Sequence, residues 1–120
     1  MREIRKYEVF KKSHKLALDV YRVTATFPQI EVYGLAAQTR RAAYSIPMNL
    51  AEGVAREGAK EFAQFVNIAI GSCEELRYQL FLAKDLSYIG EKNYRLLEQG
   101  YESIKRMLTQ LYKKLRTANS

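Results

Sequence analysis

Polar and charged side chains that could do chemistry gather in one stretch, Q-T-R-R-A-A-Y-S-I-P-M-N-L-A-E-G, which runs from Gln38 to Gly53. Glu52 is its only carboxylate. The stretch offers no second carboxylate, nucleophile or metal ligand with which Glu52 could act as a general acid or base. Glu52 does stand four residues before Arg56, a spacing that favours an ion pair on a helix. We therefore expect a structural role for Glu52 and no catalytic residue in this stretch.

Two adjacent arginines, Arg40 and Arg41, precede the proline of this stretch. A guanidinium group suits both carboxylate and phosphate partners. Because about 100° of rotation separates adjacent residues of a helix, the two side chains must face different partners. We expect Arg41 to contact phosphate, and Arg40 to contact a carboxylate or a neighbouring subunit. The alternative for both is an ordinary solvated arginine.

Pro47 lies inside a pattern that otherwise predicts a continuous helix. Apolar or small residues recur at steps of three and four on both sides of it, at Leu35, Thr39, Ala43, Ile46, Leu50 and Val54. Proline lacks the N–H that would bond the Ala43 carbonyl, a loss of about 3 kcal/mol in a helix interior. We expect a kink at Pro47 that sets subunit geometry, with Ser45 and Asn49 satisfying the backbone groups that it frees.

The remaining reactive side chains are isolated from one another. Cys73 and His14 are the only cysteine and the only histidine, so neither predicts a metal site or a catalytic pair. We expect no cofactor and no enzyme activity, with Cys73 as a small core residue. The lone cysteine and an N-terminus without a long apolar run favour the cytoplasm. No stretch approaches the roughly 18 apolar residues of a transmembrane helix, so we expect no membrane partner.

The elements that position these residues are helices. Prolines and glycines divide the 120-residue chain, and apolar residues recur every three or four positions between them. The pattern predicts an all-α domain over residues 1–120, with helices at about residues 7–26, 33–57, 60–89 and 92–117. Short connections favour an antiparallel up-down-up-down four-helix bundle. We expect the second helix to end with Gly58 as a left-handed cap, and the third to stop at Gly90.

Some apolar residues fall outside the stripes that would form the core of one bundle. Ile70 and Phe81 lie on a flank of the third helix, and Leu18 and Tyr21 make a similar shoulder on the first. Such surface is usually covered by another subunit, so we expect a homo-oligomer. The alternative is that these are ordinary exposed side chains. In the same third helix, the small residues Gly71 and Ser72 are expected to permit close helix packing.

The formal net charge is +7, and its distribution indicates an anionic partner. Residues 1–30 carry seven Lys and Arg against three acidic residues, and residues 91–120 carry the same numbers. In the expected bundle the first and last helices are neighbours, so their charges should merge into one basic region. The candidate phosphate-binding residues are Lys11, Lys12, Lys15, Arg22, Arg41, Arg95, Arg106, Lys113, Lys114 and Arg116.

The chain resembles a known family along nearly its whole length. The string Q-x-R-R-A-A-x-S-I-P-x-N-x-A-E-G is the most specific feature, and F-K-K-S-H-K-L-A-L-D-V-Y, K-E-F-A-Q-F-V-N-I-A-I-G-S and E-E-L-R-Y-Q-L-F-L-A-K-D-L accompany it. Together they resemble the four-helix-bundle proteins named after 23S rRNA intervening sequences. The resemblance implies a non-enzymatic homopentamer with a basic surface. The family is also similar in fold to the accessory variability protein of diversity-generating retroelements. That protein binds nucleic acid and assists a reverse transcriptase.

The sequence as a whole therefore predicts a basic, homo-oligomeric four-helix bundle without catalytic activity. We expect it to bind RNA or DNA through phosphates with little sequence preference, since no base-reading motif occurs. Its partners would be further copies of itself, nucleic acid and, by resemblance, a reverse transcriptase. The alternative function is a protein-protein adaptor whose basic surface docks an acidic protein.

Overall fold

The computed structural model describes residues 3–118, and within them it has helices and no strands. The four α-helices are α1 (Glu8–Thr24), α2 (Leu35–Val54), α3 (Ala59–Asp85) and α4 (Glu91–Arg116). Two short 3-10 helices, η1 (Ile4–Lys6) and η2 (Gln29–Glu31), precede α1 and α2. The expected all-α, four-helix fold class is confirmed. No helix in this part of the chain is both long enough and apolar enough to cross a membrane.

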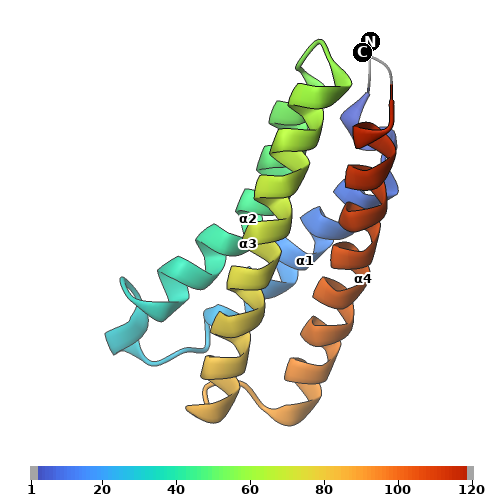
Figure 1. The fold of residues 1–120 in the computed structure, drawn as a ribbon. Helices are drawn as coiled ribbons and strands as arrows, with labels where there is room; N and C mark the ends of the chain where they lie inside the picture. The colour runs from blue at the N-terminus through green and yellow to red at the C-terminus, as the bar shows by residue number, and fades with distance from the viewer. Residues whose placement is uncertain (1–2, 119–120) are drawn as a thin grey trace.

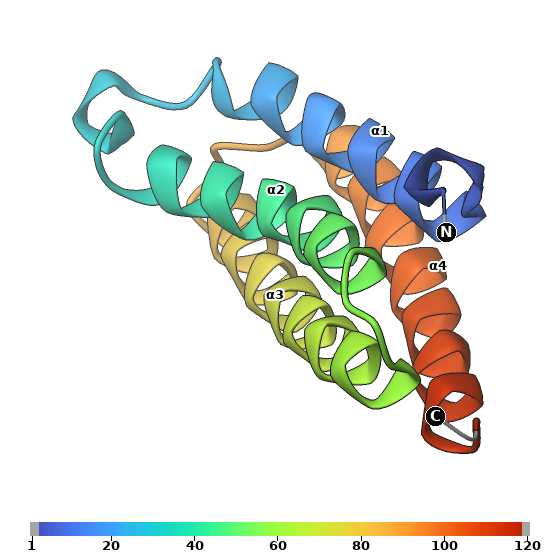
Figure 2. The same ribbon diagram turned by 90° about the horizontal axis from the view of Figure 1, so that it is seen from above.

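Each helix packs against two of the other three. Helix α1 contacts α2 and α4, α3 contacts the same two helices, and the diagonal pairs make no contact within the described residues. In Figure 1 the chain runs downward along α1, upward along α2, downward along α3 and upward along α4. Figure 2, seen from above, shows that the start of α1 and the end of α4 lie apart from each other.

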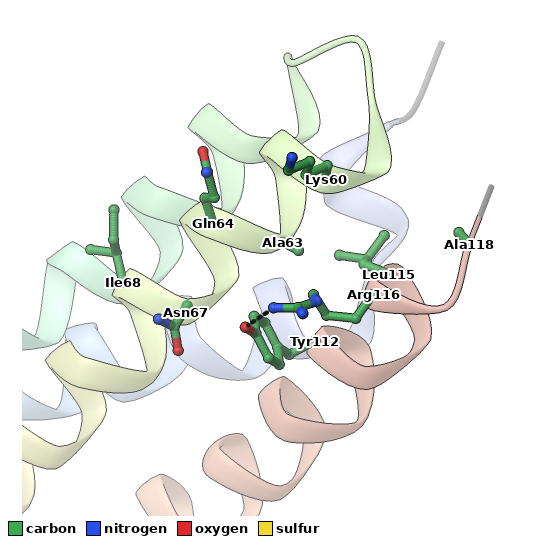
Figure 3. Close-up of a pocket in the computed structure, with 9 residues that line it drawn as sticks. All are labelled: Lys60, Ala63, Gln64, Asn67, Ile68, Tyr112, Leu115, Arg116 and Ala118. Atoms are coloured by element: carbon green, nitrogen blue, oxygen red, sulfur yellow. Dashed lines mark hydrogen bonds between the residues drawn. The ribbon is translucent and has the colours of Figure 1, made fainter. Parts of the chain in front are cut away.

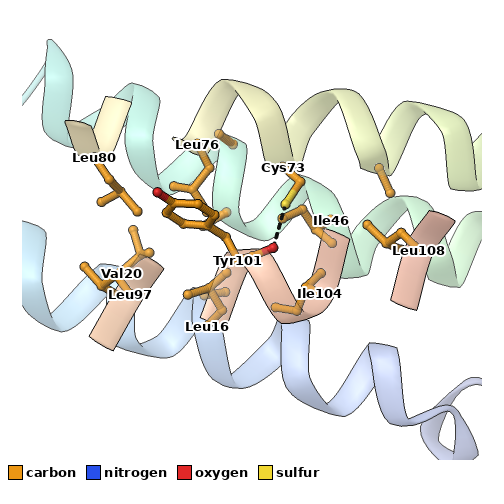
Figure 4. Packing of buried hydrophobic residues seen from close by; sticks show 14 of the residues in the cluster. Leu16, Val20, Ile46, Cys73, Leu76, Leu80, Leu97, Tyr101, Ile104 and Leu108 are labelled. Carbon is orange, nitrogen blue, oxygen red and sulfur yellow. Dashed lines mark hydrogen bonds between the residues drawn. The ribbon is translucent and has the colours of Figure 1, made fainter. Parts of the chain in front are cut away.

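The apolar stripes of the four helices meet in one core. On α1 the buried positions recur at steps of three and four, at Val9, Ser13, Leu16, Val20 and Thr24. The other three helices supply most of the largest side chains that are less than 2% exposed. They include Ile46, Leu50, Phe62, Leu76, Leu80, Tyr101, Ile104 and Leu108. Figure 4 shows Tyr101 and Cys73 facing each other in this core, where the Cys73 thiol donates to the Tyr101 carbonyl at 3.4 Å. Periodicity therefore identified the buried face of every helix correctly.

The helix ends differ from those expected, because the glycines begin helices and do not end them. Gly58 and Gly90 are extended residues, with φ of −105° and −73°, directly before α3 and α4. The left-handed residue is Ser87 (φ 64°), which ends α3 four residues earlier than expected. There the Tyr88 N–H bonds the Ala83 carbonyl at 2.8 Å. The expectation of a left-handed cap at Gly58 is wrong, because α2 has already ended at Val54.

The close approach of α2 and α3 depends on Gly53 rather than on Gly71. A Cβ atom on Gly53 would lie 2.8 Å from Phe62 Cδ1 and 2.9 Å from Phe65 Cβ. Gly71 is exposed, and a Cβ atom there would meet nothing within 4 Å. The prediction for Gly71 is therefore wrong, since this glycine faces away from the neighbouring helices. Ser72 is the small buried residue beside it.

Candidate nucleic-acid interface

Arg40 lies between α2 and the C-terminal end of α1. Its Nε donates to Thr24 Oγ1 at 2.7 Å and its Nη2 donates to the Tyr21 carbonyl at 3.3 Å. Its guanidinium carbon also lies 4.7 Å from the centre of the Tyr21 ring. A cation at this position complements the negative end of the α1 dipole. Arg40 thus joins two helices of the same chain, and within the described residues it has no carboxylate partner.

The side chains around Pro47 bond within the chain as well. Pro47 is buried inside α2, and Asn49 Nδ2 donates to the Ser45 carbonyl at 2.8 Å and to Ser45 Oγ at 3.2 Å. The carbonyl that Pro47 leaves without its usual N–H donor is that of Ala43. Asn49 bonds a different carbonyl, so it does not satisfy the group that the proline frees. Ser72 Oγ donates to Ser45 Oγ at 3.1 Å, so the cluster links α2 to α3.

The ion pair expected between Glu52 and Arg56 is present, with 3.2 Å between Oε2 and Nη2. The Arg56 guanidinium carbon also lies 4.8 Å from the centre of the Phe65 ring on α3. Arg56 lies two residues beyond the end of α2 at Val54, and Glu52 is exposed on α2. A structural role fits these contacts.

Three of the four α1 cations expected to bind phosphate already have carboxylate partners. Asp19 accepts from Lys15 Nζ at 2.9 Å and from Arg22 Nη2 at 2.6 Å. Burial tends to raise the pKa of Asp19, but the hydrogen bonds from these two cations outweigh it and lower that pKa. Lys11 pairs with Glu8 at 3.4 Å. The positive potential of α1 is therefore weaker than its count of basic residues indicates.

The α4 cations divide into a neutralised set and an unpaired set. Arg95 lies 3.1 Å from Glu91 and 3.3 Å from Glu98. Four other predicted phosphate ligands are exposed and have no carboxylate within 4.0 Å among residues 3–118: Lys12 on α1 and Arg106, Lys113 and Lys114 on α4. Arg41 on α2 is exposed in the same way. The unpaired set retains its full charge for an external anion.

The second half of α4 contains no acidic residue. Residues 103–118 carry five Lys and Arg and no Asp or Glu. Beside this stretch, Glu74 on α3 pairs with Lys105 on α4 and, at 3.5 Å, with Arg77. Arg77 also lies 3.9 Å from Glu102 on α4. The hydrogen bond from Lys105 lowers the pKa of Glu74, so this network is ionised and internally balanced. The acid-free C-terminal half of α4 therefore carries a local excess of positive charge.

The basic ends of α1 and α4 do not merge into one region. The two helices are in contact at Gly100, where a Cβ atom would lie 3.2 Å from Leu16 Cδ1. Beyond this point they separate, and Figure 2 shows the start of α1 well away from the end of α4. Lys12 and Lys15 line a shallow groove with the middle of α4 instead. The predicted single basic region is wrong for this reason, and the charge lies in two places.

A groove between α3 and α4 brings further polar side chains to the end of α4. Lys60 and Asn67 come from α3, and Tyr112 and Arg116 come from α4 (Figure 3). Sequence reasoning had selected Arg116 but missed the α3 residues. Lys60, Gln64 and Asn67 are spaced by four and three positions, so one face of the helix carries all three. That spacing is the signal that could have found them.

Several large apolar side chains are exposed, and the two most exposed lie in the connection between α1 and α2. Ile30 is 85% exposed and Tyr33 is 94% exposed, whereas Leu18 and Phe81 are about half exposed. The expectation for Ile70 is wrong, because this residue is partly buried against the core of its own chain. Uncovered apolar surface therefore exists both in this connection and on α3, where Ile68, Tyr78 and Phe81 are exposed.

The buried thiol of Cys73 and the possible metal ligands can be judged from the described residues. Burial raises the pKa of the Cys73 thiol to about 12, so the thiolate nucleophile does not form near neutral pH. No group of three or more His, Cys, Asp or Glu side chains among residues 3–118 is arranged to hold a metal ion. The arrangement presents charge and hydrogen-bonding groups at the surface.

Comparisons with known proteins agree with the fold. A crystal structure of a protein of unknown function from the S23 ribosomal protein family of Bacteroides thetaiotaomicron superposes with a TM-score of 0.81. The match covers 88% of this chain and 95% of that one, at 23% sequence identity. A comparison with curated proteins found no match. The family model of the 23S rRNA-intervening sequence proteins matches residues 5–110, and the chain therefore belongs to the family of the 23S rRNA-intervening sequence proteins.

Proposed function

We propose that this protein binds nucleic acid through phosphate contacts and performs no catalysis. The observation that carries the proposal is the acid-free half of α4, where five Lys and Arg stand in residues 103–118 without a single Asp or Glu. Of these five, only Lys105 has a carboxylate partner within the described residues. Unpaired surface cations release counterions from a phosphate backbone on binding, and this release drives association without regard to base sequence.

Self-association would strengthen such binding. A ring of five copies, as proposed from the family resemblance, would repeat the same basic surface five times and raise its potential for a polyanion. The exposed Ile30 and Tyr33 support an assembly, since single chains rarely leave such side chains uncovered together. A reverse transcriptase that acts on the bound nucleic acid is the proposed protein partner, on the same ground of resemblance.

The test is a titration of labelled duplex DNA and structured RNA with the protein, followed by fluorescence anisotropy at several salt concentrations. We expect the logarithm of the binding constant to fall linearly with the logarithm of salt concentration, with a slope of about −0.9 per phosphate contacted on duplex DNA. Light scattering on the same sample establishes the size of the assembly.

Two substitutions in α4 make a matched pair for this titration. Arg106→Gln removes an exposed cation without a carboxylate partner, and Arg95→Gln removes one held by Glu91 and Glu98. Both change the net charge by one. We expect Arg106→Gln to weaken binding and reduce the salt slope by about 1, and Arg95→Gln to have the smaller effect.

The outcome also separates this function from the adaptor that the sequence left open. If the wild-type protein at about 50 mM salt bound neither nucleic acid, phosphate recognition would be wrong. The basic surface would then be assigned to an acidic protein partner. Equal effects of the two substitutions would remove the C-terminal half of α4 from the interface.

A further inference from the structure

The groove between α3 and α4 combines groups that the rest of the basic surface lacks. It has a volume of about 770 Å³, and Lys60, Asn67, Tyr112 and Arg116 lie along it. Figure 3 shows the Arg116 side chain extending from α4 toward α3, with Tyr112 beside it and Asn67 on the α3 side of the groove. Arg116 Nη1 donates to the Tyr112 hydroxyl at 2.9 Å, which holds the guanidinium over the groove.

The cations of this groove are free to take an anion. Lys60 is exposed and has no carboxylate within 4.0 Å among residues 3–118. Arg116 has only Tyr112 as a side-chain partner: it bonds the neutral hydroxyl, and its guanidinium carbon lies 5.7 Å from the centre of the ring. Most of its N–H groups therefore remain available. A guanidinium held in one orientation is suited to a phosphate oxygen pair.

The groove also offers what a nucleobase needs. Asn67 is exposed, and no other described residue bonds its amide, so one donor group and one acceptor remain for a base edge. Tyr112 is partly buried against the core and presents an aromatic ring on the wall of the groove. Aromatic rings and guanidinium planes stack on unpaired bases, which a duplex does not expose.

We propose that this groove holds one unpaired nucleotide, with its phosphate at Lys60 and Arg116 and its base against Tyr112 and Asn67. The proposal rests on the proposed nucleic-acid binding and deepens it by assigning a preference for single strands over duplexes. The outer surface of α4 supplies phosphate contacts to either form. The groove adds contacts that only an unpaired nucleotide can make.

The experiment measures the ratio of affinities for a 5′-labelled single-stranded RNA and for the duplex of the same sequence and length, in one buffer. The groove variants are Asn67→Ala, Arg116→Gln and Tyr112→Leu, with Tyr112→Phe as the variant that keeps the ring. Arg106→Gln is the control, because Arg106 is an unpaired α4 cation that does not line the groove. Thermal melting of each variant verifies that the bundle is folded.

We expect the wild-type protein to prefer the single strand, and Tyr112→Leu to lower the single-strand affinity by roughly 5- to 150-fold, the range for loss of one stacked base. Arg116→Gln and Asn67→Ala should lower the same affinity with a smaller loss on the duplex. Tyr112→Phe should retain most of the preference, and Arg106→Gln should weaken both ligands alike. Asn67 is at the surface, so its variant tests the groove even if Tyr112→Leu unfolds the protein.

The results distinguish a failure of the proposed nucleotide site from a failure of the proposed nucleic-acid binding. If the wild-type protein binds both RNAs and the groove variants leave the affinity ratio unchanged, the groove is not a nucleotide site, whereas phosphate binding stands. If the wild-type protein binds neither RNA, the proposed function itself is overturned, and the nucleotide site with it.

Discussion

The bonding of individual side chains decides which basic residues can serve an external ligand. Lys15 and Arg22 share the carboxylate of Asp19, and Arg40 is engaged at the end of α1. Arg41 is adjacent to Arg40 in sequence, yet it is exposed and has no carboxylate partner within the described residues. Two arginines of the same motif therefore have different tasks, as their angular separation on the helix requires.

Arg40→Met is expected to destabilise the fold while leaving nucleic-acid affinity nearly unchanged. The substitution removes the hydrogen bonds to Thr24 Oγ1 and the Tyr21 carbonyl and the contact with the Tyr21 ring. Hydrogen bonds from a charged group contribute about 1.5–3 kcal/mol each, and partial exposure reduces this. We expect a loss of about 1–2 kcal/mol in the free energy of unfolding, measured by urea denaturation. Arg41→Met is the control, and an equal loss there would contradict the assignment.

Spacing along one helix predicted contacts that packing between helices did not. The Glu52–Arg56 pair lies at the i, i+4 spacing and could be read from the sequence. The bond from Arg40 to Thr24 joins residues sixteen positions apart, and it depends on how α1 and α2 pack. The same holds for the α3–α4 groove, whose walls come from distant segments. Residue patterns thus identified cations, and packing decided which of them remained free.

At the scale of helices, the contact between α2 and α3 requires a glycine at position 53. The Gly53 backbone meets Phe62 and Phe65 at distances that leave no room for a Cβ atom. The sequence motif around Pro47 ends with this glycine. Packing therefore explains why residue 53 is a glycine, whereas the expected kink at Pro47 stays a prediction.

Gly53→Ala and Gly71→Ala should change stability in opposite directions. The first places a Cβ atom 2.8 Å from Phe62 Cδ1, so the helices must shift, with an expected loss of about 1–3 kcal/mol. The second adds a methyl group in open space on a helix, where alanine is favoured over glycine by up to about 1 kcal/mol. Thermal or urea unfolding of both variants measures the difference. A destabilised Gly71→Ala would mean that its surface is covered by another molecule.

The helix boundaries show where local sequence rules fail at this scale. Glycine is the common left-handed residue at helix ends, so Gly58 and Gly90 were natural candidates. The chain instead ends α3 at Asp85, with the left-handed Ser87 two residues later, and both glycines are extended residues directly before the next helix. A rule based on residue type cannot distinguish the end of one helix from the start of the next when both lie within a few residues.

At the scale of the whole molecule, the distribution of charge and of exposed apolar residues separates two surfaces. Three of the unpaired cations, Arg106, Lys113 and Lys114, lie in the C-terminal half of α4, whereas Ile30 and Tyr33 lie in the connection that projects beside α2 at the lower left of Figure 1. A binding surface and an assembly surface can therefore be occupied together. This arrangement is what a basic ring around a polyanion requires.

The exposed connection between α1 and α2 should be part of the contact between copies of the chain. Burying one large apolar side chain contributes about 1.5–3 kcal/mol, so replacing both Ile30 and Tyr33 by serine should weaken association by tenfold or more. Light scattering at matched concentrations should detect a smaller assembly, while the thermal unfolding of the monomer stays close to that of the wild type. Leu96→Ser is the control, because Leu96 is a 59% exposed residue on α4, away from this connection. An unchanged mass for Ile30→Ser, Tyr33→Ser would place the contact elsewhere, and a monomeric wild-type protein would contradict assembly altogether.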